Sequence, residues 1–290
     1  MALHGIEGMG AATFDKLVTR FGSPRDVLTK ATKARLAGLS RLPVGLAEGI
    51  AEARGRIDDA ERLIESLAAD GIRIVTIEDG DYPALLRRIR RPPPLLYCRG
   101  EVTDADASAV AIVGSTHPSA EGRKWARGFA RRLAEAGHTV VSGYAHGIDS
   151  AAHLGAIEGG GRSLFVLPTG IRRFEPRRCF PEASALAANG AILSECPPDQ
   201  EWTTPAALAR NRITAGLSRA VLVIEARRKS GTMATFKIAR REGIPCFVLR
   251  YDNPPPTALG NAVAIADGGT PVTSYADLDK IIDALAPEKG

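Results

Sequence analysis

The chain has 290 residues, 44% of them hydrophobic, so it is long enough to bury a core in one large domain with a smaller companion. Its formal net charge of +5 and pI near 9.2 favour a polyanionic partner. No apolar run approaches the roughly 20 residues of a membrane span, no secretory pattern opens the chain, and four scattered cysteines show no metal-ligand spacing, so we expect a cytoplasmic protein with reduced thiols, no metal and no membrane partner.

Residues 1–70 show little strand pattern and predict a small domain of short helices. Gly5–Gly10 precedes one helical stretch, and Leu39–Pro43 precedes another. Two helices joined by a glycine-containing turn resemble a helix-hairpin-helix or SAM-like module, which binds nucleic-acid backbone through turn amides. Short helical bundles of this composition also serve as protein-contact domains, so both alternatives remain open.

Residues 71–290 predict an α/β domain. A strand at 72–76 and a proline-rich extended connection at 91–97 lead into a regular alternation of strand and helix. Apolar runs predict strands at 109–113, 138–141, 163–167, 191–194, 220–224 and 245–249, with helices near 120–136, 149–158, 182–188, 204–216, 231–241 and 275–285. Strands that are apolar throughout are typical of a sheet covered on both faces, so this order predicts a doubly wound parallel sheet.

Small glycine-containing loops follow three of these strands. They comprise Gly114, Ser115 and Thr116; Ser142, Gly143, Tyr144, His146 and Gly147; and Ser230, Gly231 and Thr232. Because the carboxyl ends of parallel strands meet at one edge of a sheet, we expect the loops to line a single phosphate-binding groove. The first loop lacks the G-x-G-x-x-G spacing of a dinucleotide site, so no cofactor is expected, and alone it could equally be a plain turn.

Polar side chains near these loops each have two interpretations. Asp149 could cap a helix or support the second loop, and His153, one turn later, could be structural or catalytic. Arg210-Asn211-Arg212 could clamp a phosphate or form surface ion pairs. Glu195 and Glu225 end strands, where they could serve acid/base chemistry, but we expect them to be buried partners of these arginines.

Basic and aromatic residues add to the case for a nucleic-acid partner. Arginine-rich clusters occur at 87–91, 172–173, 177–178 and 227–229, and the planar guanidinium group suits phosphate. Single-strand binding usually combines such charges with aromatic stacking, for which Tyr144 and Phe236 are candidates, although both rings could belong to the core.

Together these motifs resemble the DNA-processing protein A family (DprA, also called Smf). The matching residues begin at Asp81-Tyr82-Pro83, end near Asn261, and include 110–115, 142–153, 194–195, 210–218, 223–226 and 230–232. The resemblance implies an extended Rossmann-like domain that binds single-stranded DNA, forms a homodimer and loads the RecA recombinase in natural transformation, without catalytic turnover. It implies that the three loops and Arg210, Asn211 and Arg212 contact DNA, with Asp149, His153, Glu195 and Glu225 in support.

Four positions depart from the family pattern. Thr116 and His146 stand where basic residues are usual, Ala207-Leu208 replaces Phe-Pro, and a Pro-Gly pair is missing near 249–251. Two of these changes remove positive charge, so we expect weaker DNA binding, and a histidine at 146 would make binding stronger at acidic pH. Two other functions remain open: a nucleotide-binding or nucleotide-hydrolysing enzyme, although the Pro-Gly-Gly-x-Gly-Thr loop of a related hydrolase family is missing, and a diverged scaffold with a protein or small-ligand role.

Overall fold

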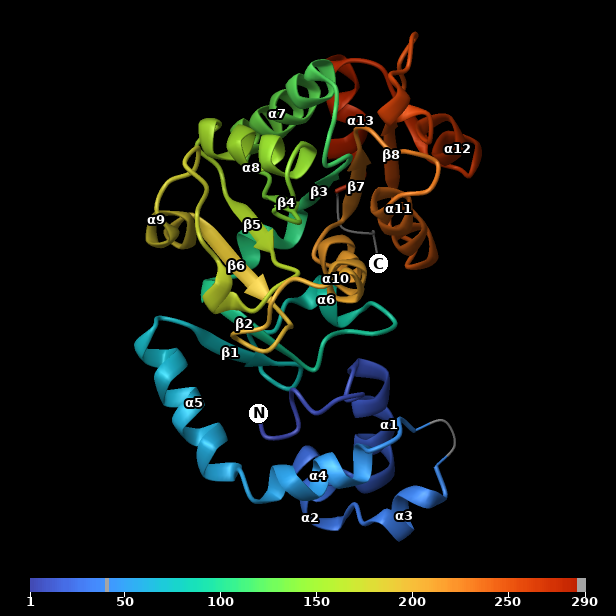
Figure 1. Ribbon diagram of the computed structural model, residues 1–290. Coiled ribbons are helices and arrows are strands. Elements are labelled where there is room, and N and C mark those ends of the chain that lie inside the picture. The colour runs from blue at the N-terminus through green and yellow to red at the C-terminus, as the bar shows by residue number, and fades with distance from the viewer. Residues whose placement is uncertain (40–41, 286–290) are drawn as a thin grey trace.

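The computed structural model describes residues 1–39 and 42–285 and contains a nine-stranded sheet with helices on both faces (Figure 1). The strand order is β1-β2-β6-β5-β4-β3-β7-β8-β9. The strands are β1 (Arg73–Thr76), β2 (Leu95–Gly100), β3 (Val110–Val113), β4 (Val140–Ser142), β5 (Ser163–Val166), β6 (Gly190–Ser194), β7 (Ala220–Val223), β8 (Cys246–Leu249) and β9 (Thr270–Val272). The strands from β6 to β9 are parallel, which confirms the predicted Rossmann-like α/β fold.

Alternation within the strands sends side chains into cores on both faces of the sheet. In β3, Val110 and Ile112 join one buried cluster, while Ala111 and Val113 join the other. The first cluster lies under α7 (Ala120–Glu135), α8 (Ile148–Glu158) and α13 (Leu278–Asp283), with α5 (Ile57–Ala69) and α9 (Ala183–Ala188) on the same side. The second lies under α6 (Ala84–Arg87), α10 (Thr204–Gly216), α11 (Gly231–Arg241) and α12 (Asn261–Ala266). Both faces are therefore covered, as the apolar strands predict.

The sheet is mixed rather than wholly parallel. The predicted extended connection at 91–97 instead leads into β2, which pairs antiparallel with both β1 and β6. Leu95 to Cys98 are all buried, so the apolar side chains that follow the proline run place this segment inside the sheet. The short elements β9 and α12 were not predicted, because three residues with a central proline carry almost no strand signal.

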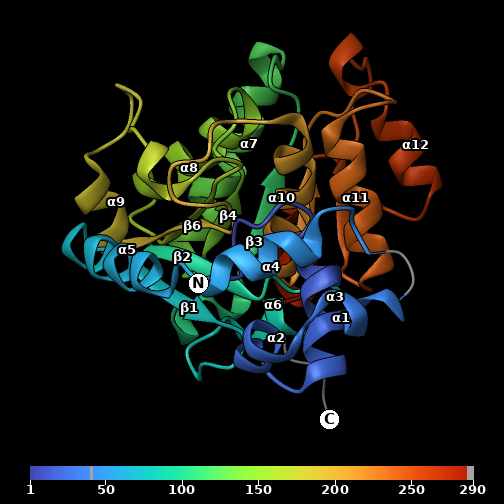
Figure 2. The same ribbon diagram turned by 60° about the horizontal axis from the view of Figure 1, so that its bottom comes forward.

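The N-terminal helices have a core of their own. They are α1 (Ala11–Phe21), α2 (Pro24–Lys30), α3 (Lys33–Ala37) and α4 (Leu46–Arg54), and their buried cluster draws only on residues 3–50 among those described. They lie beyond the β1–β2 side of the sheet (Figure 1, Figure 2). His4 joins them to the body: its Nε2 lies 2.9 Å from the carbonyl oxygen of Glu195, and its Nδ1 lies 3.0 Å from the hydroxyl of Tyr97.

Three details of this region concern its last helices, its predicted turn and its boundary with the sheet domain. The helical structure of residues 46–69 is interrupted at Gly55 and Arg56, so this stretch forms two helices, α4 and α5. Ser40 and Arg41, in the predicted helix-hairpin-helix turn, lie outside the described residues. Leu67 of α5 packs in the core of the sheet, so the domain boundary near residue 70 stays a prediction.

Two further features concern the whole chain. All four cysteines are free thiols, and only Cys179 among them is exposed. No helix within the described ranges has the length and apolar character needed to cross a membrane.

Candidate nucleic-acid interface

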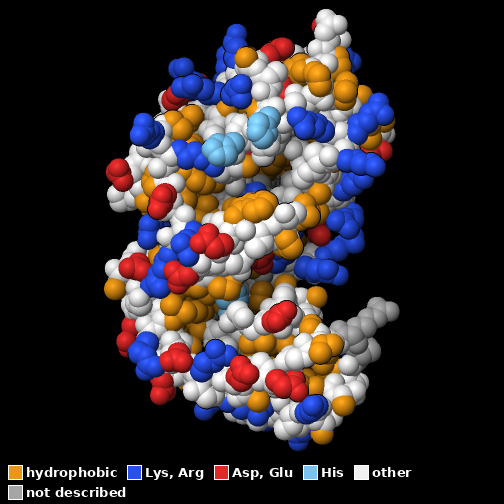
Figure 3. All heavy atoms as spheres, in the orientation of Figure 1, with side chains coloured by type: hydrophobic (Ala, Val, Ile, Leu, Met, Phe, Trp, Pro, Cys, Tyr) orange, Lys and Arg blue, Asp and Glu red, His pale blue; other side chains and the backbone are white. Residues whose placement is uncertain are grey.

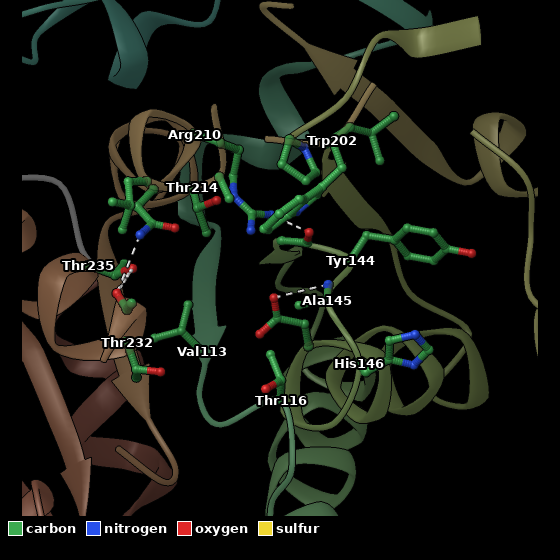
Figure 4. A pocket seen from close by; sticks show the side chains of 18 of the residues that line it. Val113, Thr116, Tyr144, Ala145, His146, Trp202, Arg210, Thr214, Thr232 and Thr235 are labelled. Carbon is green, nitrogen blue, oxygen red and sulfur yellow. Dashed lines mark hydrogen bonds between the residues drawn. The ribbon is translucent and has the colours of Figure 1, made fainter. Parts of the chain in front are cut away.

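A cavity of about 730 Å³ opens at the carboxyl ends of β3, β4, β5 and β7 (Figure 4). The chain leaves β3 for β4 on one side and later returns to β7 on the other, so the cavity lies at the switch point where ligands bind in open α/β sheets. The predicted site residues that line it are Gly114, Ser115, Thr116, Gly143, Tyr144, His146, Asp149, Arg210, Asn211, Ser230, Gly231 and Thr232. All three predicted loops therefore meet at one site.

The loop after β4 is tightly held. Tyr144 adopts a left-handed backbone (φ 55°), and Arg177 braces it by donating from Nη2 to the Tyr144 carbonyl oxygen at 2.6 Å. The Tyr144 ring packs against Phe174 and other aromatic side chains, with the Arg177 guanidinium 4.2 Å from its centre. In Figure 4 this ring points away from Arg210 and Thr232. Tyr144 therefore contributes its backbone to the cavity, and its ring is not free to stack.

Arg210 connects the carboxyl ends of two strands beside the cavity. Its side chain is buried, and Nη1 donates to the carbonyl oxygens of Gly143 and Val166, the latter at 2.6 Å. A Cβ atom at Gly143 would lie 1.9 Å from Nη1, which explains the glycine at this position. Burial lowers the pKa of the guanidinium, partly offset by the charge of Asp149. Arg210 therefore ties β4 and β5 to α10.

Asp149 supports the second loop rather than capping α8. The residue before the helix is Gly147, which has no side chain to cap with, and Asp149 lies in the first turn. Its carboxylate accepts a hydrogen bond from the N–H of Ala145 at 3.3 Å. Burial raises the pKa of this carboxyl group, while the charge of Arg210 acts in the opposite direction.

Arg212 does not line the cavity. Its Nη1 and Nη2 each bond to a carboxylate oxygen of Glu195 at 2.5 Å, and Nε donates to the carbonyl oxygen of Arg91 at 2.9 Å. Successive helical residues point in different directions, so Arg210 faces the loops while Arg212 faces the β2–β6 side. Glu195 thus pairs with Arg212, and of the two arginines only Arg210 lines the cavity while Arg212 holds other parts of the chain together.

Four other predicted site residues do not line the cavity: Ser142, Gly147, His153 and Glu225. Glu225 is fully buried and accepts hydrogen bonds from Ser119, Tyr251 and Thr257, so it does not pair with Arg210 or Arg212. His153 is fully buried and stacks on a phenylalanine ring, and burial lowers its pKa to about 3.

Ser142 and Gly147 act within the protein. The Ser142 hydroxyl donates to the carbonyl oxygen of Ile112 at 2.7 Å. Gly147 has φ +81°, and a Cβ atom there would lie 2.5 Å from the carbonyl oxygen of Ser115, so this glycine lets the first two loops touch.

The third loop supplies a helix N-terminus. Ser230 caps α11 by accepting the N–H of Met233 at 3.3 Å. The first N–H groups of any helix lack partners within the helix, and here the residues that carry them, Gly231 and Thr232, line the cavity. An anion at this position would meet both free donors and the positive end of the helix dipole.

Several cavity residues were missing from the predicted site. They are Arg173, Arg177, Arg227, Lys229, Trp202, Leu208 and Thr214, among others. The arginine-rich clusters at 172–173, 177–178 and 227–229 were the signal for the cations. Nothing in the sequence indicated which loop Trp202 faces.

The cavity is positively charged. Five cationic side chains line it (Arg173, Arg177, Arg210, Arg227 and Lys229), against two carboxylates (Asp149 and Glu175). Arg227 and Lys229 form no ion pair with any residue in the described ranges. Figure 3 shows Lys and Arg side chains along the upper and right-hand parts of the face, whereas Asp and Glu are more frequent in its lower half.

No group of three or more His, Cys, Asp or Glu side chains within residues 1–39 and 42–285 is arranged to hold a metal ion. Two residues that line the cavity carry a buried polar atom without a hydrogen-bond partner among the described residues. These atoms are Nε of Arg210 and Oγ1 of Thr214.

Comparisons with known proteins agree with one another. The model of the DNA recombination-mediator protein A family matches residues 73–284. Protein Smf of Synechocystis is 35% identical over 256 residues, which cover 86% of this chain and 63% of that protein, so the chain spans less than two thirds of this relative. The crystal structure of DNA processing protein A from Streptococcus pneumoniae superposes with a TM-score of 0.79 at 29% identity, covering 96% of this chain and 95% of that one. The Helicobacter pylori protein of the same name, described for its single-stranded DNA binding mode, gives a TM-score of 0.62 at 28% identity, covering 73% of this chain and 95% of that one.

Proposed function

Because the chain belongs to the DNA recombination-mediator protein A family, we propose that it is a single-stranded DNA-binding protein that holds the strand in the switch-point cavity. The DNA backbone would lie across the N-terminus of α11 and the cationic side chains around it. The protein acts by binding, without turnover of the strand.

The observation that carries this proposal is that two cations without an ion pair in the described ranges lie next to a helix N-terminus. Lys229 and Arg227 precede α11, whose first residues, Gly231 and Thr232, face the same space. Phosphate suits both kinds of donor. A cavity of about 730 Å³ exceeds the space that one small anion fills, so it has room for part of a strand.

Anisotropy of a labelled single-stranded oligonucleotide, titrated at several salt concentrations with duplex as competitor, tests the proposal. We expect salt-sensitive binding with preference for the single strand. Lys229→Ala should lower affinity and reduce the slope of log K against log salt by about 0.7, the contribution of one phosphate contact on a single strand.

Lys237→Ala is the matched control. Lys237 is an exposed lysine on α11, outside the cavity, so its removal changes net charge equally and should leave the slope unchanged. Equal effects of the two substitutions would mean that the cavity does not hold the backbone. Failure of the wild type to bind any DNA at low salt would instead favour the diverged-scaffold alternative.

The geometry disfavours the nucleotide-hydrolysing alternative. The carboxylate of Glu195 is bound by Arg212, and the buried carboxylate of Glu225 accepts hydrogen bonds from one amide and three hydroxyl groups. Neither carboxylate lines the cavity. Release of free base from nucleotides, abolished by Glu225→Gln, would revive that alternative.

The partners implied by the family complete the proposal. We infer a cytoplasmic homodimer that delivers the bound strand to the RecA recombinase. Light scattering of the purified protein tests the dimer. Strand exchange by RecA on DNA already covered by single-strand binding protein tests the delivery, which requires faster exchange when this protein is added.

A further inference from the structure

Trp202 is an exposed aromatic side chain in the cavity wall. The residue is 59% exposed, and Leu208, which also lines the cavity, is 48% exposed. Trp202 makes no ring contact and no hydrogen bond with the described part of the chain. In Figure 4 it extends into the cavity on the side of Arg210 and opposite Thr232. Covering an exposed indole ring removes apolar surface from water, which is favourable. A ligand with a flat apolar surface would therefore bind well there.

The backbone that carries Trp202 is fixed on both sides. On the N-terminal side, the N–H of Gly170 donates to the carbonyl oxygen of Gln200 at 2.8 Å. Thr203 caps α10 by accepting the N–H of Ala206 at 3.2 Å. Because the backbone here is already held and tryptophan has only two side-chain torsions, ordering its ring against a ligand costs little conformational entropy.

We propose that Trp202 is the stacking platform for a nucleobase of the bound strand, an inference that rests on the proposed function. The ligand must offer a flat ring on one side and a phosphate on the other. The indole and the cations Arg227 and Lys229 line the same cavity, together with the N-terminus of α11. A nucleotide joins these two chemical groups in one unit.

Neither of the two aromatic residues that the sequence suggested for stacking has a ring that is free to pack on a base. Phe236 is 1% exposed and lies in the core under the sheet, and the ring of Tyr144 packs among aromatic side chains, covered by Arg177. Thr116 and His146, in place of basic residues, leave the opposite wall with less charge. Base stacking on Trp202 therefore compensates for lost phosphate contacts in this chain.

Tryptophan fluorescence reports the contact directly, because the chain has two tryptophans. Trp125 lies on α7, where it packs against Tyr275, and it does not line the cavity. The variant Trp125→Phe therefore keeps Trp202 as its single tryptophan, and Trp202→Phe keeps Trp125. Addition of a thymidine oligonucleotide of about 15 nucleotides should quench emission of the Trp125→Phe protein and leave the Trp202→Phe protein unchanged. A strand of the same length without bases should quench neither.

Affinities measured on the same two strands separate base stacking from backbone contact. Trp202→Ala should weaken binding of the thymidine strand by about 5- to 150-fold, the range for loss of one base–aromatic stack. The same substitution should leave binding of the strand without bases unchanged, because the missing contact involves the base. Ile64→Ala, which removes a side chain 44% exposed on α5, is the control and should affect neither.

The outcomes separate this inference from the proposed function. Equal weakening on both strands would overturn it, because Trp202 would then contact the backbone or stabilise the fold. Unchanged affinity without quenching would also overturn it while the proposed function stands. Absence of wild-type binding to either strand would overturn the proposed function and this inference with it.

Discussion

Arg210→Met should cost stability more than it costs DNA contacts. The substitution keeps the unbranched stem and removes the guanidinium, so the buried carbonyl oxygens of Gly143 and Val166 each lose a charged donor. Hydrogen bonds to charged groups contribute about 1.5–3 kcal/mol each, and water from the adjoining cavity can replace part of this loss. We expect the free energy of unfolding to fall by about 3 kcal/mol, measured by urea unfolding at pH 7.

The DNA affinity of the same variant distinguishes two roles. If Arg210 ties the strands together, affinity measured where the variant is fully folded should retain the wild-type salt slope. The control is Arg212→Met, which leaves the mostly buried carboxylate of Glu195 without its partner outside the cavity; it should destabilise the protein by a similar amount and also retain the wild-type salt slope. Stability within 1 kcal/mol of wild type together with a 10-fold loss of affinity would refute the reasoning, because Arg210 would then hold a phosphate directly.

Four further substitutions test particular contacts. Gly143→Ala should lower the melting temperature, since its Cβ would lie 1.9 Å from Arg210 Nη1, whereas Gly231→Ala should leave it equal or higher, since the nearest atom is 4.0 Å away; calorimetry that ranks them in the reverse order would contradict the contacts. His146→Lys should raise the affinity for single-stranded DNA at low salt and steepen the slope of log K against log salt by about 0.7; an unchanged slope would mean that the exposed residue 146 contacts no phosphate. Burial lowers the pKa of His153 from 6.5 to about 3, so the unfolded chain takes up the proton first and stability falls as the pH drops below 6.5; the fall should reach about 3 kcal/mol between pH 7 and 4, and urea unfolding of His153→Phe should lack it.

The fold was largely predictable because its strands are buried on both faces. Apolar runs such as 220–224 leave no ambiguity when helical segments separate them. β2 was misinterpreted because a proline run masks its start, although Leu95 to Cys98 carry a plain strand pattern. β9 could not be predicted, since its register is set by β8 rather than by its own residues.

The site was predictable where a loop directly follows a strand and obscure elsewhere. Topology brings Gly114, Gly143 and Gly231 to one edge, and each precedes or follows a regular element. Trp202 reaches the cavity through a long irregular connection between β6 and α10, whose path depends on contacts far apart in the chain. The direction of Arg210 and Arg212 was likewise undetermined, because helix phase alone does not say which face meets the sheet.

Pro271 limits how copies of this protein can associate. Val272 directs its carbonyl oxygen toward β8, accepting the N–H of Arg250 at 2.8 Å, so the alternate residue Pro271 directs its backbone toward the open edge of the sheet. An added strand would need an N–H at that position, and proline has none. Main-chain ladders are the route by which sheets polymerise, and this edge is closed to them. Any association of copies at that end would therefore depend on side-chain contacts.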